Sequence, residues 1–195
     1  MNIISLLILI VSIVAHEVAH GLAALWQGDR TAKDQGRLTL NPLAHIDPMG
    51  SIFVPLFLFV IGSPFMFGWA KPVPINPYNF KNLKYGEAMV SFAGPLVNII
   101  FVIVFSLLLH FVPMNEVYVG VSQMIILINI VLALFNLMPI PPLDGSKILF
   151  SIIPQRFYRV RQYLEAKSFL FWIIIILLVW TVFERLVYWI FSLLV

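Results

Sequence analysis

The chain has 195 residues, of which 61% are hydrophobic and only 11% are charged, and its mean hydropathy is +0.98. This composition excludes a soluble globular domain and indicates an integral membrane protein with a handful of spans. The formal net charge is +3, and the absence of cysteine excludes disulfides and thiolate metal ligands.

The first apolar run covers residues 2–26 and contains the motif H-E-x-x-H at residues 16–20. On a helix, His16 and His20 lie one turn apart on one face, so both imidazoles can reach one metal ion. Two neutral imidazoles suit Zn²⁺, and a third ligand plus an open water position would make the site catalytic. Glu17 projects about 100° away from His16 and can reach such a water without being a ligand. Ionisable groups are costly inside a membrane helix, which favours a metal site over a buried polar cluster.

Further apolar segments cover residues 51–67, 86–112, 118–138 and 169–195. Four of the five are long enough to cross a bilayer core of about 30 Å, but the segment 51–67 is short and interrupted by prolines. If it dips in and returns, all Lys and Arg residues except Arg185 share one side, which by the positive-inside rule is cytoplasmic. We therefore expect an all-α polytopic protein with about four transmembrane helices, a re-entrant or short fifth segment, and the motif in the cytoplasmic half.

Residues 36–40, Gly-Arg-Leu-Thr-Leu, alternate in polarity and predict a short β-strand or hairpin element. The edge of such a strand can pair with an extended peptide, and an ordinary surface hairpin is an equal alternative. His45 follows in a loop, where a single histidine more often has no metal role, so we leave it out of the ligand set.

The span 86–112 contains Gly94-Pro95-x-x-Asn98. Pro95 predicts a kink or a change of direction, and Gly94 permits close helix contact. The amide of Asn98 requires a partner in an apolar helix, and a bond to another helix is favoured over one to bound peptide. His110 lies far from the H-E-x-x-H end of the bundle, which argues against a metal role.

The fourth span ends in residues 135–145, Phe-Asn-Leu-Met-Pro-Ile-Pro-Pro-Leu-Asp-Gly. Three prolines in four residues end the helix and make the chain extended just inside the membrane. Asp144 then lies in the same half of the membrane as His16 and His20. We predict that it is the third ligand, with a helix cap for the segment near Ser146 as the alternative.

Residues 155–167 form a basic amphipathic stretch that we expect on the cytoplasmic membrane surface, against anionic lipid. The sequence offers no basic, folded soluble face, so nucleic-acid binding is not expected.

Together, the motifs at residues 16–20, 94–98 and 136–145 resemble the three signature elements of the site-2 protease family of intramembrane zinc metalloproteases. The run 68–74, Gly-Trp-Ala-Lys-Pro-Val-Pro, resembles a compact bacterial or archaeal branch of that family. The resemblance covers nearly the whole chain and implies one membrane metalloprotease domain over residues 1–195. The chain departs from many relatives of that family in that we expect no PDZ or CBS domain within it.

The resemblance also implies one zinc ion per chain, with Glu17 as general base and acid. The implied zinc ligands are His16, His20 and Asp144. Asn136 would hold the substrate or the oxyanion. Asn98 is a second candidate for contact with the substrate or the oxyanion, and by the resemblance it would help to form the core.

The function that this implies is zinc-dependent hydrolysis of peptide bonds within or near transmembrane segments of membrane-protein substrates, at the cytoplasmic side of the cell membrane. A metalloprotease with a downstream glutamate ligand is disfavoured, because the later glutamates sit in segments without a matching motif. A non-proteolytic metal-binding scaffold or transporter is the alternative, and it would keep its function in Glu17→Gln. The sequence does not indicate an oligomeric state.

Overall fold

The computed structural model describes residues 3–62, 68–113, 115–153, 158–167 and 169–195. Within these residues, four helices are long and apolar enough to cross a membrane. They are α1 (Ile3–Trp26), α4 (Gly86–Phe111), α5 (Glu116–Leu137) and α8 (Phe169–Leu194). Each coincides with a predicted span, so the polytopic helical architecture is confirmed.

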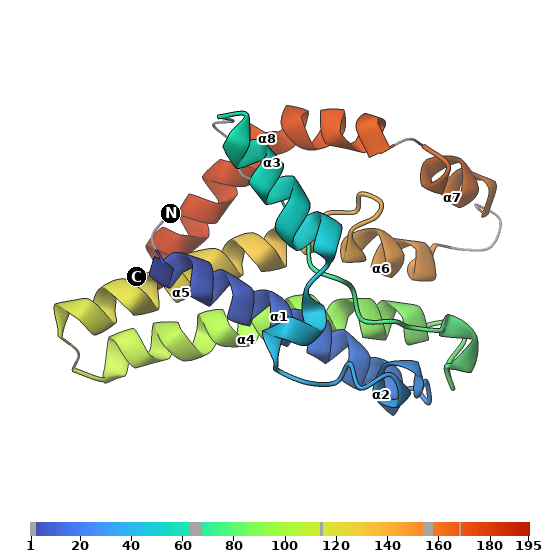
Figure 1. The fold of residues 1–195 in the computed structure, drawn as a ribbon, viewed down its shortest axis with the longest axis horizontal. Helices are drawn as coiled ribbons and strands as arrows, with labels where there is room; N and C mark the ends of the chain where they lie inside the picture. Colours follow the sequence, from blue (N-terminus) through green and yellow to red (C-terminus); the bar gives the residue numbers. More distant parts are fainter. Residues whose placement is uncertain (1–2, 63–67, 114, 154–157, 168) are drawn as a thin grey trace.

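Consecutive long helices run in opposite directions. Gln27, just beyond the end of α1, bonds to Met89 near the start of α4, whereas Ser12, near the middle of α1, bonds to Asn129, near the middle of α5. Ser106, near the end of α4, bonds to the last turn of α8. Both chain termini therefore lie towards one end of the bundle, as Figure 1 shows, with α2 (Thr31–Asp34), α6 (Asp144–Ile152) and α7 (Tyr158–Glu165) towards the other.

The largest apolar core lies between α4, α5 and α8. Its buried members are Val102, Ile126, Ile130, Phe183 and Val187. α1 also packs against α4 and α5, and its own buried residues are mostly polar or small. Polar groups are thus concentrated at the α1 interface, where they can bond to one another away from lipid.

The chain between α1 and α4 begins and ends at the same end of the bundle, because the Lys81 N–H bonds to the Gln27 carbonyl at 2.6 Å. Within it, a π-helical turn, Pro48–Phe53, leads into α3, Val54–Val60. The Trp69 N–H bonds back to the Gly50 carbonyl at 3.1 Å. Residues that flank the predicted segment 51–67 therefore meet, which fits a segment that returns to its side of entry. Residues 63–67 lie outside the described part.

The strand predicted over residues 36–40 is wrong, since the described part of the chain contains no strand. Gly36 turns the chain with a φ of +64°, and the Arg37 N–H bonds back to the Ala32 carbonyl at 2.9 Å. The Thr39 carbonyl is bonded to the His45 side chain at 2.9 Å. Local turns and side chains satisfy this backbone, so alternation in polarity does not produce a strand here.

Two 3₁₀ turns, Pro42–His45 and Pro77–Asn79, complete the connection between α1 and α4. α4 continues through Pro95 without ending, so the chain does not reverse there. The predicted amphipathic stretch 155–167 contains α7, and its first three residues lie outside the described part.

Candidate metal centre

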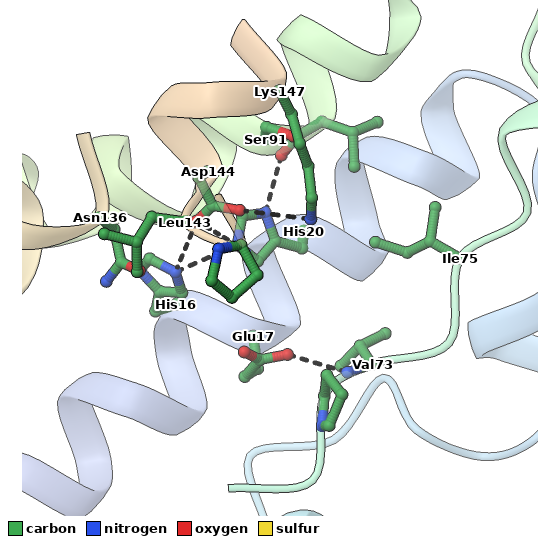
Figure 2. A pocket seen from close by; sticks show the side chains of 13 residues that line it. His16, Glu17, His20, Val73, Ile75, Ser91, Asn136, Leu143, Asp144 and Lys147 are labelled. Atoms are coloured by element: carbon green, nitrogen blue, oxygen red, sulfur yellow. Dashed lines mark hydrogen bonds and ion pairs between the residues drawn. The ribbon is translucent and has the colours of Figure 1, made fainter. Parts of the chain in front are cut away.

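Three side chains from two distant parts of the chain meet at one point. His20 Nε2 lies 3.0 Å from His16 Nε2 and 3.1 Å from Asp144 Oδ2, and His16 Nε2 lies 3.2 Å from the same oxygen. All three residues are buried. Figure 2 shows the two imidazoles and the carboxylate pointing toward one another. The predicted ligand set is thus brought together by helix α1 and the first residue of α6.

The other nitrogen of each imidazole is held by a hydrogen-bond acceptor. His16 Nδ1–H donates to Asn98 Oδ1 at 2.6 Å, and His20 Nδ1–H donates to the Val90 carbonyl at 2.7 Å. An imidazole that donates from Nδ1 keeps a free lone pair on Nε2. Both Nε2 atoms are therefore prepared to ligate a metal ion, and Asn98 and the Val90 backbone fix the ring orientations.

A chain of buried polar groups continues from His16 into the bundle. Asn98 Nδ2 donates to Asn129 Oδ1 at 2.8 Å, and Asn129 Nδ2 donates to Ser12 Oγ at 3.0 Å. Asn98 and Asn129 are both fully buried. This chain of bonds joins α1, α4 and α5 behind His16. Asn98 therefore faces the ligand and the helix interface rather than a substrate, which agrees with the interhelical bond favoured for it and not with a substrate contact.

We call His16, His20 and Asp144 the triad. Gly94 lies directly against its two imidazoles. A Cβ atom on this residue would lie 2.5 Å from both His16 Nε2 and His20 Nε2. These are the same two atoms that meet Asp144. The close contact expected of Gly94 is thus a contact with the metal-binding atoms themselves, and any side chain there would occupy space beside them.

Asp144 is positioned by the turn between α5 and α6. A Cβ on Gly145 would lie 2.2 Å from the Leu137 carbonyl, so the turn closes tightly only with glycine. Ser146 Oγ bonds to the Leu143 carbonyl at 2.7 Å, and the N-cap residue of α6 is Leu143 rather than Asp144. Lys147 Nζ lies 3.7 Å from Asp144 Oδ1. Its positive charge favours the ionised carboxylate, which is the form that a metal ligand takes.

Glu17 lies beside the triad without joining it. Its Oε2 accepts the backbone N–H of Val73 at 2.8 Å, as Figure 2 shows. It lines a cavity of about 220 Å³ together with the three predicted ligands. The predicted base therefore shares open space with the metal-binding atoms, and the backbone N–H of Val73 holds its carboxylate.

Asn136 also lines this cavity, and its Nδ2 donates one hydrogen to the Leu132 carbonyl at 2.9 Å. The second amide hydrogen remains for another acceptor. His45 is bonded to Thr39 and His110 lies against Phe111, so neither histidine joins the triad. The sequence motifs did not reveal Ser12, Asn129 or Lys147. Ser12 and Asn129 are polar residues inside membrane spans, and this feature could have marked them as candidate functional residues.

The three atoms fit zinc in kind and in spacing. Zinc is commonly bound by imidazole nitrogen and carboxylate oxygen, and tetrahedral ligands at its usual bond lengths lie about 3.3 Å apart. The observed separations are 3.0, 3.1 and 3.2 Å. Three protein ligands beside a cavity leave a fourth position for water or substrate, which is the arrangement of catalytic zinc sites.

Comparison with known proteins points to the same chemistry. Residues 114–181 match the model of peptidase family M50. The chain is 43% identical over 155 residues to "Putative zinc metalloprotease YwhC" of Bacillus subtilis, which covers 75% of this chain and 67% of that protein. It is 28% identical over 189 residues to "Putative zinc metalloprotease Rip2" of Mycolicibacterium smegmatis, which covers 94% and 71%.

A third relative, "Zinc metalloprotease MJ0392" of Methanocaldococcus jannaschii, is 26% identical over 151 residues, which covers 77% of this chain and 34% of that protein. No solved structure matches the chain. The extent of the similarity to the Bacillus protein establishes the family, and the triad supplies the metal-binding groups that such an enzyme needs. The chain belongs to peptidase family M50, the site-2 protease family, and is a zinc metalloendopeptidase.

Proposed function

We propose that this enzyme cleaves peptide bonds within or near the transmembrane segments of membrane-protein substrates. The observation that carries the proposal is the position of the site: two metal-binding histidines and the candidate base lie on α1, a helix long and apolar enough to span the bilayer. A substrate bond must therefore reach the site at membrane depth. A water-filled cavity makes polar groups tolerable there.

In this mechanism, His16, His20 and Asp144 would hold the zinc ion. When bound, zinc supplies Lewis acidity, which polarises a peptide carbonyl and lowers the pKa of water toward neutrality. Glu17 accepts a proton from the attacking water as the water oxygen bonds to the carbonyl carbon. Glu17 then returns the proton to the amide nitrogen as the C–N bond breaks, which leaves a carboxylic acid and an amine. The Val73 N–H keeps the Glu17 carboxylate in place through both steps.

The two asparagines have different roles in this proposal. Asn136 lines the cavity and offers its second amide hydrogen to the substrate or the developing oxyanion. Asn98 positions His16 from behind and does not contact the substrate. A substrate helix must unwind before cleavage, and residues 72–76, which form neither helix nor strand, lie beside Glu17 where the unwound segment would pass.

We place the active site towards the cytoplasm of the cell membrane. The ends of α1 and α4 that lie nearest the triad connect to the basic residues between positions 30 and 84, and Lys147 lies three residues after Asp144. By the positive-inside rule this end faces the cytoplasm. Because the chain has no cysteine, single cysteines at Tyr78 and Leu83 can be labelled in intact cells. Labelling by an impermeant maleimide from outside would contradict this orientation.

The test of the function uses purified enzyme in liposomes with a set of synthetic single-span peptides. Mass spectrometry locates each cleaved bond. We expect cleavage inside or next to the apolar span by the wild type and none by Glu17→Gln, with one zinc per chain in both. Cleavage confined to the soluble flanks of the peptides, or an undiminished rate in Glu17→Gln, would refute the proposal.

A further inference from the structure

A second cavity of about 130 Å³ adjoins the catalytic cavity. The two share four lining residues: Ile75, Val90, Ser91 and Lys147. The second cavity adds Pro77, Phe80 and Glu87, and it contains none of the metal-binding residues. In Figure 2, Ile75, Ser91 and Lys147 lie on the other side of the histidine pair from Asn136. The second cavity is therefore a side extension of the catalytic cavity.

The walls of this extension are mostly apolar and already packed. Phe80, 5% exposed, and Val90, 3% exposed, belong to a buried cluster with Ala24, against which Ile75 also packs. Ala24 lies one turn beyond His20 on α1. The wall is thus built on the same helix as the metal-binding motif, and the distance between them is set by that helix.

The turn that carries Pro77 is anchored independently. The Asp29 carboxylate, fully buried, accepts the Asn76 N–H at 2.7 Å and the Asn79 side chain at 2.9 Å. The Lys81 N–H bonds to the Gln27 carbonyl at 2.6 Å. These bonds tie both ends of the turn to the region just after α1, so the cavity exists before any ligand enters and does not have to be ordered on binding.

Its size suits a single side chain. An apolar cavity of about 150 Å³ in another protein binds benzene, so 130 Å³ accommodates one aromatic ring or one branched aliphatic group. Glu87 and Lys147 carry opposite charges in its lining. A charged substrate group of either sign would meet one opposite and one like charge, so it would gain little net attraction for the water it loses, and an apolar group is favoured over it.

We propose that the second cavity is a specificity subsite that receives a branched aliphatic or aromatic side chain from the substrate residue next to the scissile bond. The inference rests on the proposed function, because the catalytic cavity must hold that bond. In an extended peptide, neighbouring side chains point to opposite sides, so a side chain beside the cleaved bond enters the extension while the next one points away. Phe80 and Ile75 set the size of group that is accepted.

The experiment measures binding to the zinc-loaded wild-type enzyme in detergent, with turnover playing no part. The probes are small hydroxamates, which chelate zinc, carrying a methyl, isobutyl, benzyl or 4-aminobutyl group next to the chelating end. We expect the isobutyl and benzyl compounds to bind at least about tenfold more tightly than the methyl compound, as for extra carbons entering an apolar pocket. The aminobutyl compound should show no such gain.

Two variants change the size of the subsite in opposite directions. Phe80→Leu enlarges it and should raise the preference for benzyl over isobutyl, whereas Ile75→Phe narrows it and should lower that preference, with zinc content unchanged in both. Tyr78→Leu is the matched control, because Tyr78 lies in the same turn, is 91% exposed and does not line the cavity. Melting temperatures confirm that each variant is folded.

Equal affinities across the hydroxamate series in wild type would overturn the subsite, and so would equal shifts in Phe80→Leu and Tyr78→Leu. Failure of the proposed function is a separate result. In that case transmembrane peptides remain uncleaved in liposomes, while the hydroxamates still bind with the expected dependence on their side group.

Discussion

Two different substitutions of Asn98 distinguish its effect on the orientation of the ligand His16 from its effect on the packing of the helices. Asn98 accepts a hydrogen bond from His16 Nδ1 and donates one to Asn129 Oδ1. Asn98→Leu removes both bonds, whereas Asn98→Asp keeps an acceptor for His16 and loses the donor to Asn129. The two variants therefore share the damage to the α4–α5 contact and differ at His16.

The expected magnitudes follow from the buried geometry. Each unpaired polar group left at this fully buried position costs about 1–3 kcal/mol of folding free energy. Loss of the partner that orients a metal-binding histidine typically lowers metal affinity by about 10–100-fold, or about 1.4–2.7 kcal/mol. We expect that loss of zinc affinity in Asn98→Leu. In Asn98→Asp the affinity should stay within about threefold of wild type, because the carboxylate accepts the same proton.

The assay is competition for zinc with a chromophoric chelator in detergent, alongside thermal unfolding of the zinc-free proteins. We expect both variants to unfold at a lower temperature than wild type and only Asn98→Leu to lose zinc affinity markedly. Equal loss of zinc affinity in the two variants would refute the reasoning, since it would show that the packing of α4 matters and the acceptor on His16 does not.

Three further predictions concern the same site and its support. Glu17→Gln should retain one zinc per chain, measured by elemental analysis, while its cleavage rate falls by at least about a hundredfold, because general acid–base catalysis typically contributes about 10²–10⁴-fold; a rate near wild type would exclude Glu17 as the base. Gly94→Ala should lower zinc affinity at least tenfold, because its Cβ would press on both Nε2 atoms at 2.5 Å, and Gly120→Ala is the control, since a Cβ there meets nothing within 4 Å. Burial raises the pKa of Asp29, but hydrogen bonds from Thr31, Asn76 and Asn79 outweigh burial and lower it; its stabilisation is therefore complete above the unfolded pKa of about 3.9 and is lost as the pH falls below it. Asp29→Asn should cost about 2 kcal/mol at pH 7 and less at pH 3, measured by chemical unfolding, and an equal cost at both pH values would contradict this.

The long helices were predictable because the bilayer sets their length and composition. Spans of about 20 apolar residues are visible in the chain whatever their partners are, and α1, α4, α5 and α8 lie where they were expected. Alternation in polarity wrongly predicted a strand at residues 36–40. There the Arg37 N–H bonds to the Ala32 carbonyl, Thr39 Oγ1 accepts the Asn41 N–H, and the His45 side chain bonds to the Thr39 carbonyl. The conformation of short irregular segments depends on such contacts, which the periodicity of polar and apolar residues does not reveal.

Some features of the metal site were likewise predictable from the sequence and others were not. His16 and His20 are neighbours because of helical geometry alone, so the motif can be recognised in the sequence. Asp144 was placed near them by its depth in the membrane, and its contact with both Nε2 atoms required the tight turn at Gly145. The role of Asn129 could not be predicted, because nothing in its own segment indicates that Asn98 lies opposite.

The sequence by itself determined the membrane setting, the four spans, the metal chemistry and the family, since these depend on composition and on contacts within one helix or one motif. Only the tertiary structure decided that Asn98 orients His16, that Val73 holds Glu17, and that a second cavity opens beside the catalytic one. Those features arise where α1, α4, α6 and the chain at residues 72–80 converge. Contacts between segments so distant along the chain are set by how the helices pack, and packing depends on all of the surfaces at once.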